Sequence, residues 1–509
     1  MGQHLARLAL LTTTLGGCSW LYDPDRLSPA VDALVPPPDI SRPDLRLTDV
    51  GPPVIYEGQG DGGSRAAIVV VRGSNIAQDA RIEIVPAMGQ MMFTVGTPVI
   101  ASDFGSLAVP LTIPATKLLT GDVLLDITIT QPLDDGTTVS QSLKEKLTLR
   151  GLPELDKDSI QAPGNIANTV QLLPLYSKID LSQNPSISWV GTKRVELRAT
   201  SSITVANLQA NGGNASMNTP GAGGPGGCSG GGPSAKGLCA GGGGPGASAP
   251  VLGSAGGGGG AGFASAGNPG GGNGAGAPGT SAGSPTIATY DGFETFTANM
   301  ASGGGGGGNI GLTGMGAGGG GGGGIIELTA GGNVKTGTLT VLGGKGGEVN
   351  LQGSGGGGAG GVVMLRSGGT LEVMMANVSG GGGGTTAPAG GAGSAGRVRW
   401  DVPLQSAAPP PATPVTPHRG PAYAKDTPLI FNEATPSITV YGTVNDSFDI
   451  NITDQDSALH SNDNATFAGT AVTIKPKLQR GYNLLCISLS GGKRGTAEAD
   501  KCIEVAFVP

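Results

Sequence analysis

A 17-residue block of alternating apolar and polar positions occurs three times in the middle of the chain, beginning at Val195, Ile326 and Val363. Apolar or small residues recur at offsets 0, 2 and 4, two turn residues follow, and apolar positions return at offsets 8, 13 and 15 before a closing Gly-Gly pair. A period of two predicts β-strands. Because one block has about one buried face per strand, it cannot form a core alone. Stacking the blocks with equivalent positions above each other gives a parallel β-solenoid.

Stacking also predicts which side chains share a column. Offset 2 puts Leu197, Leu328 and Leu365 in one inward column, and a fourth start at Val398 adds Trp400. Offsets 1 and 3 point outward and form a possible surface-binding stripe that includes Glu196, Arg198, Glu327, Arg366, Arg399 and Asp401. The stripe mixes both charges, so we expect solvated ion pairs worth under about 1 kcal/mol each. Leu365→Asp should therefore be severe and Arg366→Asp mild.

Glycine fills the space between the blocks, since the chain has 97 Gly in 509 residues and most of them follow Gly212. Such runs match glycine-rich phosphate loops by chance, so they predict no nucleotide site. Two interpretations remain for the long insertion, residues 212–308. The runs form either floppy loops or extended helices with three residues per turn, in which the missing side chain lets backbones touch.

The N-terminus has the pattern of an export signal over residues 1–18, with Arg7 before a short apolar stretch. Leu15-Gly16-Gly17-Cys18 resembles the bacterial lipobox, which implies a lipoprotein anchored through Cys18 in the outer membrane, facing the cell surface or the periplasm. Residues 19–51 are rich in Pro and Asp and are expected to be a semi-rigid tether.

Two further segments alternate with the short spacing of β-sandwiches. Residues 52–154 contain the passage Ile68 to Ile76, followed by Ala80 to Ile84, which resembles the opening of a TIG-type immunoglobulin-like domain. Residues 427–509 contain Ile438 to Val444, which is similar to bacterial immunoglobulin-like domains of the glucodextranase-associated type. The glycine-rich solenoid is assigned to residues 155–403, with residues 155–194 as its cap, and a Pro-rich linker to 404–426. The predicted fold is therefore all-β, with a solenoid between two immunoglobulin-like sandwiches.

Candidate chemistry is sparse. A charged fraction of 13% and a net charge of −7 argue against nucleic acid as partner. None of the three His lies on a scaffolded strand end, so no catalytic residue, metal site or cofactor is predicted. In an exported chain the pairs Cys228/Cys239 and Cys486/Cys502 are expected to be disulfides. Asp residues crowd the last domain, where solvated turns are favoured over a calcium site, at Asp446, Asp449, Asp454, Asp456 and Asp463.

Lipobox, sandwich, glycine-rich repeats and terminal sandwich together resemble glycine-rich surface lipoproteins of myxobacterial type. The sequence thus predicts a non-catalytic, lipid-anchored structural or adhesive protein. Its partners would be the membrane, through the lipid, and an extracellular polysaccharide or another surface protein. The alternative is a carbohydrate-binding or polysaccharide-degrading β-helix protein, but such an enzyme would cluster carboxylates on one face, and this stripe does not.

Overall fold

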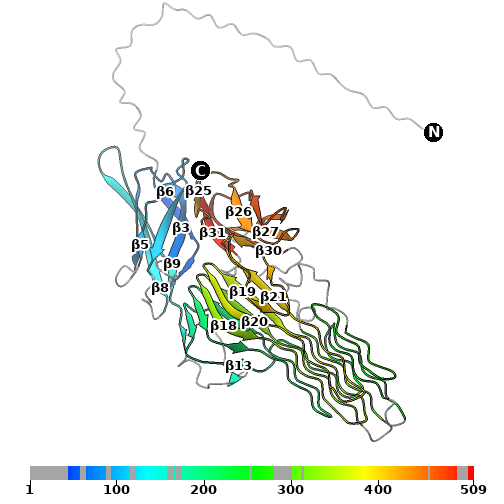
Figure 1. Cartoon of the computed structure of the whole chain (residues 1–509). Coiled ribbons are helices and arrows are strands. Elements are labelled where there is room, and N and C mark those ends of the chain that lie inside the picture. The colour runs from blue at the N-terminus through cyan, green and yellow to red at the C-terminus, as the bar shows by residue number, and fades with distance from the viewer. Residues whose placement is uncertain are drawn as a thin grey trace, which may run out of the picture. The chain divides into compact units, whose positions relative to one another are not determined.

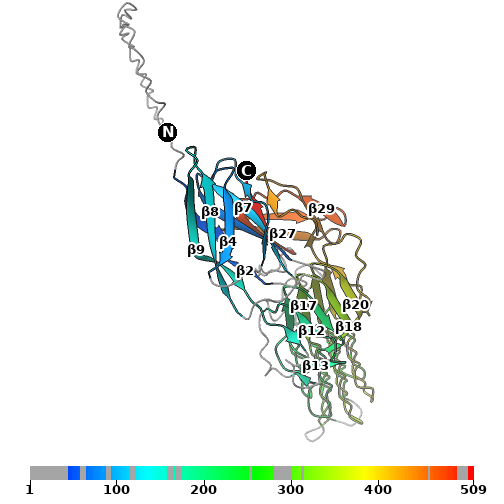
Figure 2. The same ribbon diagram turned by 90° about the vertical axis from the view of Figure 1, so that its left-hand side faces the viewer.

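The computed structural model (Figures 1 and 2) describes most of the chain after residue 43. The described ranges are 44–57, 65–87, 93–114, 121–156, 165–166, 175–250, 255–279, 301–310, 315–456, 459–489 and 502–509. Every regular element in these ranges is a β-strand, so the predicted all-β class is confirmed. The predicted signal and most of the predicted tether lie outside the described residues.

The first unit consists of two sheets that face each other across a core. One sheet contains β1 (Arg46–Gly51), β3 (Arg65–Ser74), β5 (Thr94–Val95), β6 (Val99–Ile100) and β7 (Ser106–Ile113). The other contains β2 (Val54–Tyr56), β4 (Arg81–Pro86), β8 (Val123–Pro132) and β9 (Thr138–Arg150). Strand β1 lies within the predicted tether and pairs with β3, so the first unit begins before residue 52.

The middle of the chain forms a parallel stack of strands in two sheets around one apolar core. The first sheet is β14 (Val195–Ala199), β17 (Ile325–Ala330), β19 (Val362–Ser367), β21 (Arg397–Asp401) and β23 (His418–Arg419). Leu197, Leu328, Leu365 and Trp400 are register partners in this order and are buried, as the offset pattern predicts. Strand β14 pairs directly with β17, so the insertion between them adds no coil to this sheet.

The second sheet of the stack carries the remaining block positions, with Ile203, Val334 and Leu371 in register. Its strands are β10 (Leu155–Asp156), β11 (Asn165–Ile166), β12 (Ile179–Leu181), β13 (Ile187–Trp189), β15 (Ile203–Val205), β16 (Leu208–Gln209), β18 (Val334–Thr340), β20 (Leu371–Asn377) and β22 (Ala412–Thr413). Strands β12 and β13 cover the first block, as expected of a cap. The predicted linker 404–426 is a further coil instead, because β22 and β23 continue both sheets.

The glycine runs pack side by side into what we call the glycine bundle, made of extended segments ("arms") within residues 210–250, 255–279, 301–310, 315–324, 341–361 and 378–396. In the arm 303–308 successive N–H groups donate to three different neighbouring arms, and the same three recur every third residue. The N–H groups of Gly303 and Gly306 donate to the carbonyls of Leu238 and Ala235, respectively. In the same order, Gly304 and Gly307 donate to Gly320 and Ala317, and Gly305 and Gly308 donate to Gly259 and Gly256, all at 2.8–3.2 Å. A repeat of three without internal bonds is the geometry of an extended three-residue helix. Of the two open interpretations, the described arms follow the packed one.

Crowding explains why the central arms are pure glycine. A Cβ added to Gly304 or Gly305 would collide with the backbone of another arm. The peripheral arm 265–279 has glycine where a Cβ would meet another arm's backbone, at Gly267, Gly270, Gly276 and Gly279, and has Ala and Pro at exposed positions between them. Composition thus follows the number of neighbours that each arm has.

The last unit again has two sheets around a core. They contain β24 (Ala422–Tyr423), β26 (Ile438–Tyr441) and β29 (Ala471–Ile474), and β25 (Ile430–Phe431), β27 (Ser447–Asp454), β28 (Leu459–Thr466), β30 (Gly481–Leu489) and β31 (Cys502–Phe507). This unit also packs on the first one, through a cluster that includes Ile68, Val70, Tyr482 and Val508. The two ends of the described chain are therefore joined by apolar contact.

Candidate functional site

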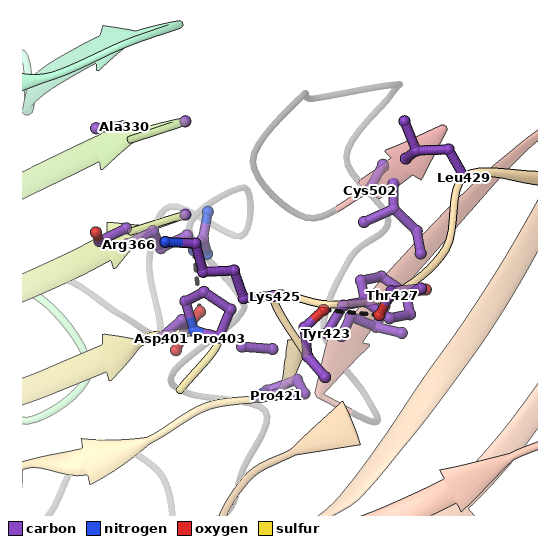
Figure 3. Close-up of a pocket in the computed structure, with 17 residues that line it drawn as sticks. Ala330, Arg366, Asp401, Pro403, Pro421, Tyr423, Lys425, Thr427, Leu429 and Cys502 are labelled. Carbon is purple, nitrogen blue, oxygen red and sulfur yellow. Dashed lines mark hydrogen bonds and ion pairs between the residues drawn. The ribbon is translucent and has the colours of Figure 1, made fainter. Parts of the chain in front are cut away.

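A cavity of about 280 Å³ lies where strands β17, β19 and β21 end against the last unit (Figure 3). The stack contributes Arg366, Asp401 and the turn after β19, and the last unit contributes Tyr423, Lys425 and Ile503. Burial raises the pKa of the Tyr423 hydroxyl. The lining combines charged groups, such as Arg366, Asp401 and Lys425, with apolar ones, such as Ile487 and Ile503.

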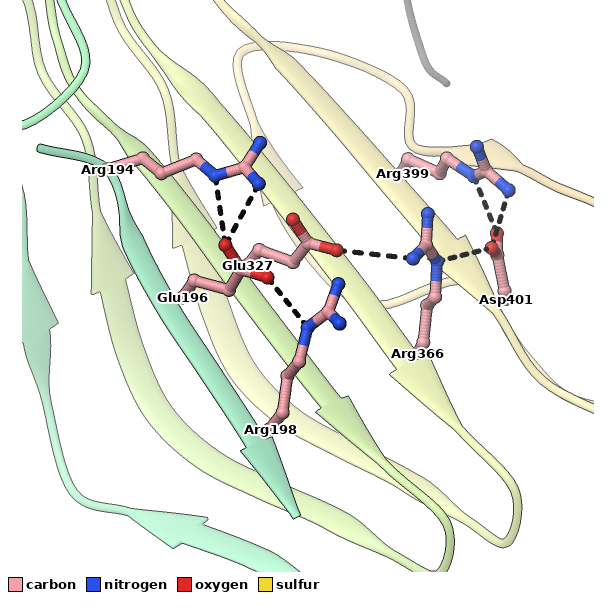
Figure 4. A network of polar contacts seen from close by, with 7 residues as sticks. All are labelled: Arg194, Glu196, Arg198, Glu327, Arg366, Arg399 and Asp401. Carbon is pink, nitrogen blue, oxygen red and sulfur yellow. Dashed lines mark hydrogen bonds and ion pairs between the residues drawn. The ribbon is translucent and has the colours of Figure 1, made fainter. Parts of the chain in front are cut away.

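The six residues of the predicted stripe are brought together in one network with Arg194 (Figure 4). Arg366 donates to Glu327 and to Asp401, both at 3.2 Å, and thus bridges three neighbouring strands. Arg399 pairs with Asp401 at 2.6 Å. On β14, Glu196 accepts from Arg194 and from Arg198 at 2.9 and 2.7 Å. Each acid of the stripe therefore has at least one arginine partner.

Most of the stripe is buried, so the expectation that Arg366 faces solvent, on which the mild effect of Arg366→Asp depended, is wrong. Side-chain exposure is only 3% for both Glu327 and Arg366 and 8% for Asp401, although Glu196 keeps 29%. The backbone at Gly420 lies against Arg399 and Asp401, and Phe263 from the bundle lies under the Arg397 guanidinium at 4.6 Å. Burial raises the pKa of Glu327, and the charge of Arg366 opposes that shift. The face that these strands were predicted to turn to solvent is therefore buried inside the molecule, and we call this buried row of ion pairs the seam.

Two further expectations about polar residues need correction. His418, predicted to lie in a linker, is in β23, and its Nε2 is 2.6 Å from Oδ2 of Asp446. Asp446 is 6% exposed, so it is not a solvated turn residue. This pair joins the end of the stack to the last unit. Within the described residues no cluster of His, Cys, Asp or Glu is arranged to hold a metal ion.

The structure pairs the cysteines as the sequence predicts. Cys486 and Cys502 are directly opposite on β30 and β31, and Cys228 bonds Cys239 between two arms. Cys18 lies outside the described residues.

The turns at the far end of the glycine bundle are a surface that sequence reasoning missed. The arms extend together away from the sheets (Figures 1 and 2), so their turns gather at one end, which we call the tip. Large apolar side chains are exposed there: Met217 by 57%, Met315 by 56% and Leu351 by 61%. The signal for this surface was the position of the rare non-glycine residues between runs, such as 214–220 and 348–352.

Side chains link the turns of the tip to each other. Ser234 and Ser248 are 2.9 Å apart, and both accept from the Asn309 N–H. Glu348 accepts from Lys345 at 2.7 Å and from the Thr385 hydroxyl at 2.8 Å. These contacts lower the pKa of Glu348 to about 2. The described part of the tip is thus a joined surface of amides, hydroxyls, exposed apolar groups and the Lys345–Glu348 ion pair.

Among the residues that the structure describes, none belongs to a helix of the length and hydropathy needed to cross a membrane. A scan against protein-family models, a search of curated proteins and a search of solved structures each found no match to this chain.

Proposed function

We propose that this chain is a non-catalytic, lipid-anchored surface protein that makes an adhesive contact through the tip of its glycine bundle. One observation carries the proposal. Along their length the central arms have almost no side chains, and each arm is held by neighbouring backbones. Recognition needs side chains, and on the bundle these are concentrated in the turns. The bundle is then a rigid spacer and the tip is the contact surface.

The remaining parts fit this role. We interpret the parallel stack as a β-solenoid and the two flanking units as immunoglobulin-like sandwiches that brace its base. The lipobox-like Leu15 to Cys18 supplies an anchor to the outer membrane, and the tether follows it in the sequence. The partner would be another surface protein or an extracellular polysaccharide. A protein partner suits the exposed Met and Leu side chains better, because flexible Met side chains adapt to varied apolar surfaces.

The polysaccharide-degrading alternative is less well supported. A glycoside hydrolase needs two carboxyl groups free to act on the bond, and a lyase needs a free base. Glu327 and Asp401 are buried and held by arginines instead.

The test is adhesion of intact cells to a matrix or to each other. Replacing Met217, Met315 and Leu351 by Ser should reduce adhesion while the protein stays at the surface. Met374→Ser is the matched control, since Met374 is 73% exposed but lies on β20. Equal adhesion of the triple variant and the control would exclude the tip as the contact surface. Separately, Cys18→Ser should release the protein from membrane fractions. If the variant still sediments with membranes and the wild type carries no acyl mass, the protein has no lipid anchor at Cys18.

A further inference from the structure

Hydrogen bonds between the arms of successive coils run in one direction. Two rows repeat from coil to coil at 2.8–3.0 Å: Gly212 to Leu342 and Gly343 to Ser379 in one row, and Ala215 to Lys345 and Gly346 to Gly382 in the other. In each row the N–H group of one arm donates to a carbonyl of the arm on the next coil. The rows are three residues apart, as the three-residue repeat requires.

This ladder stops at both flanks of the bundle. The coil after the third arm has the short Pro-rich segment 403–411 in place of an arm, and no described residue accepts from the N–H groups of Gly380 and Gly383. On the opposite flank, the coil before β14 turns over residues 190–194 without an arm. The carbonyls of Asn211 and Asn214, which correspond to those of Leu342 and Lys345, accept from no described residue. One flank therefore presents two donors and the other presents two acceptors.

We propose that these flanks bind each other in different copies of this chain, so that Gly380 and Gly383 of one copy donate to the carbonyls of Asn214 and Asn211 of the next. Donors and acceptors have the same three-residue spacing, so both bonds form together. Coils without arms extend the stack on each side and would collide if the two bundles ran parallel. The copies therefore meet with antiparallel arms, as Gly304 and Gly307 already do with Gly320 and Ala317 inside the bundle.

The glycine content of the donor flank supports close approach from outside. Gly382 is exposed, and a Cβ there would meet nothing within 4 Å. No contact with a described residue explains this glycine, although glycine raises the entropic cost of ordering the arm. The peripheral arm 265–279 differs, because Pro269 and Pro278 at exposed positions offer no N–H group. Proline protects open sheet edges in the same way, so that side is closed to pairing and the Gly382 side is open.

Each copy carries both flanks, so the contact is head-to-tail and does not close on a pair. Such a contact gives an open-ended row of copies. Because the arms are antiparallel, neighbouring copies point their tips in opposite directions, so anchored neighbours would belong to facing membranes; the pairing of the flanks is independent of what the tip binds.

The experiment measures the mass of the full chain by sedimentation, in a Cys18→Ser background that removes the lipid. The mass should rise with concentration over a roughly hundredfold range. Gly382→Lys should hold the measured mass at that of a single copy at every concentration. The lysine side chain occupies the docking flank without a clash inside the molecule. Gly232→Lys is the matched control, since a Cβ at Gly232 also meets nothing within 4 Å, and it should assemble like the parent.

A mixing experiment tests the direction of the contact. Gly382→Lys keeps the acceptor flank, so substoichiometric amounts should cap the parent's rows and lower their mean mass. A parent that stays monomeric at all concentrations, or a folded Gly382→Lys that assembles like the parent, would overturn the proposal. If adding Gly382→Lys leaves the mean mass of the parent's rows unchanged, the head-to-tail pairing is wrong. Melting curves of the variants distinguish loss of docking from loss of fold.

Discussion

Arg366→Met should destabilise the parallel stack by about 3–5 kcal/mol, the usual effect of removing one partner from a buried ion pair. Arg366 bridges Glu327 and Asp401 at 3.2 Å, and both acids are almost fully buried. Asp401 keeps Arg399 as a partner after the change, so most of the loss comes from the uncompensated charge of Glu327. Adding Glu327→Met should restore much of the stability, because an apolar pair of similar volume avoids the desolvation of both charges.

Urea unfolding followed by tryptophan fluorescence measures this, since Trp189 and Trp400 both lie in the core of the stack. Lys335→Met is the control. Lys335 pairs with Glu372 across neighbouring strands at 3.2 Å, as Arg366 does with Glu327, but the two side chains are 67% and 61% exposed. Its loss should cost under about 1 kcal/mol. If Arg366→Met costs no more than Lys335→Met, the seam is solvated and our account of its burial is wrong.

Three further predictions test other parts of the fold. Gly305→Ala should destabilise the bundle by about 1–3 kcal/mol through overpacking, whereas Gly382→Ala should be neutral or stabilise it by up to about 1 kcal/mol. Equal melting temperatures of the two variants in scanning calorimetry would contradict this prediction. Replacing both Cys486 and Cys502 by Ala should cost about 3 kcal/mol in urea unfolding, since the bond closes a 16-residue separation, and an unchanged midpoint would refute this. Because the pKa of Glu348 is lowered, its contacts stabilise the protein at pH values above the ordinary glutamate pKa, and this stabilisation is lost as the pH falls towards about 2. Hydrogen exchange of the Thr385 amide, corrected for its intrinsic rate, should therefore become faster over that pH range in the parent but not in Glu348→Gln.

The register of the stack was predictable because it depends on a local pattern. Apolar residues at offsets 0, 2 and 4 define a face, and aligning that face between blocks pairs Leu328 with Leu365 without knowledge of any other part of the chain. The burial of Arg366 was not predictable in this way. The pattern assigns it to the outer face of its strand, and that face becomes internal only through segments distant in sequence, around Phe263, around Gly420 and in the last unit.

The glycine bundle marks a second limit. A three-residue extended helix has no internal hydrogen bond and, when made of glycine, no apolar face that a sequence could display. Its bonds join residues as distant as Gly305 and Gly259, so the choice between a loose loop and a packed arm is settled by neighbours and not by the run itself. His418 was assigned to a linker for a related reason, because its strand is only two residues long and surrounded by prolines.

The near absence of side chains along the arms also has a chemical consequence. Proteases identify most cleavage sites by the side chain beside the bond, and oxidation, deamidation and glycation act on side chains, so a buried glycine arm offers these agents almost nothing. Damage to the bundle should concentrate on the exposed turns, where Met217, Met315 and the asparagines lie. Outside a cell, chemical damage to the bundle would therefore accumulate at its tip while the glycine arms stay intact.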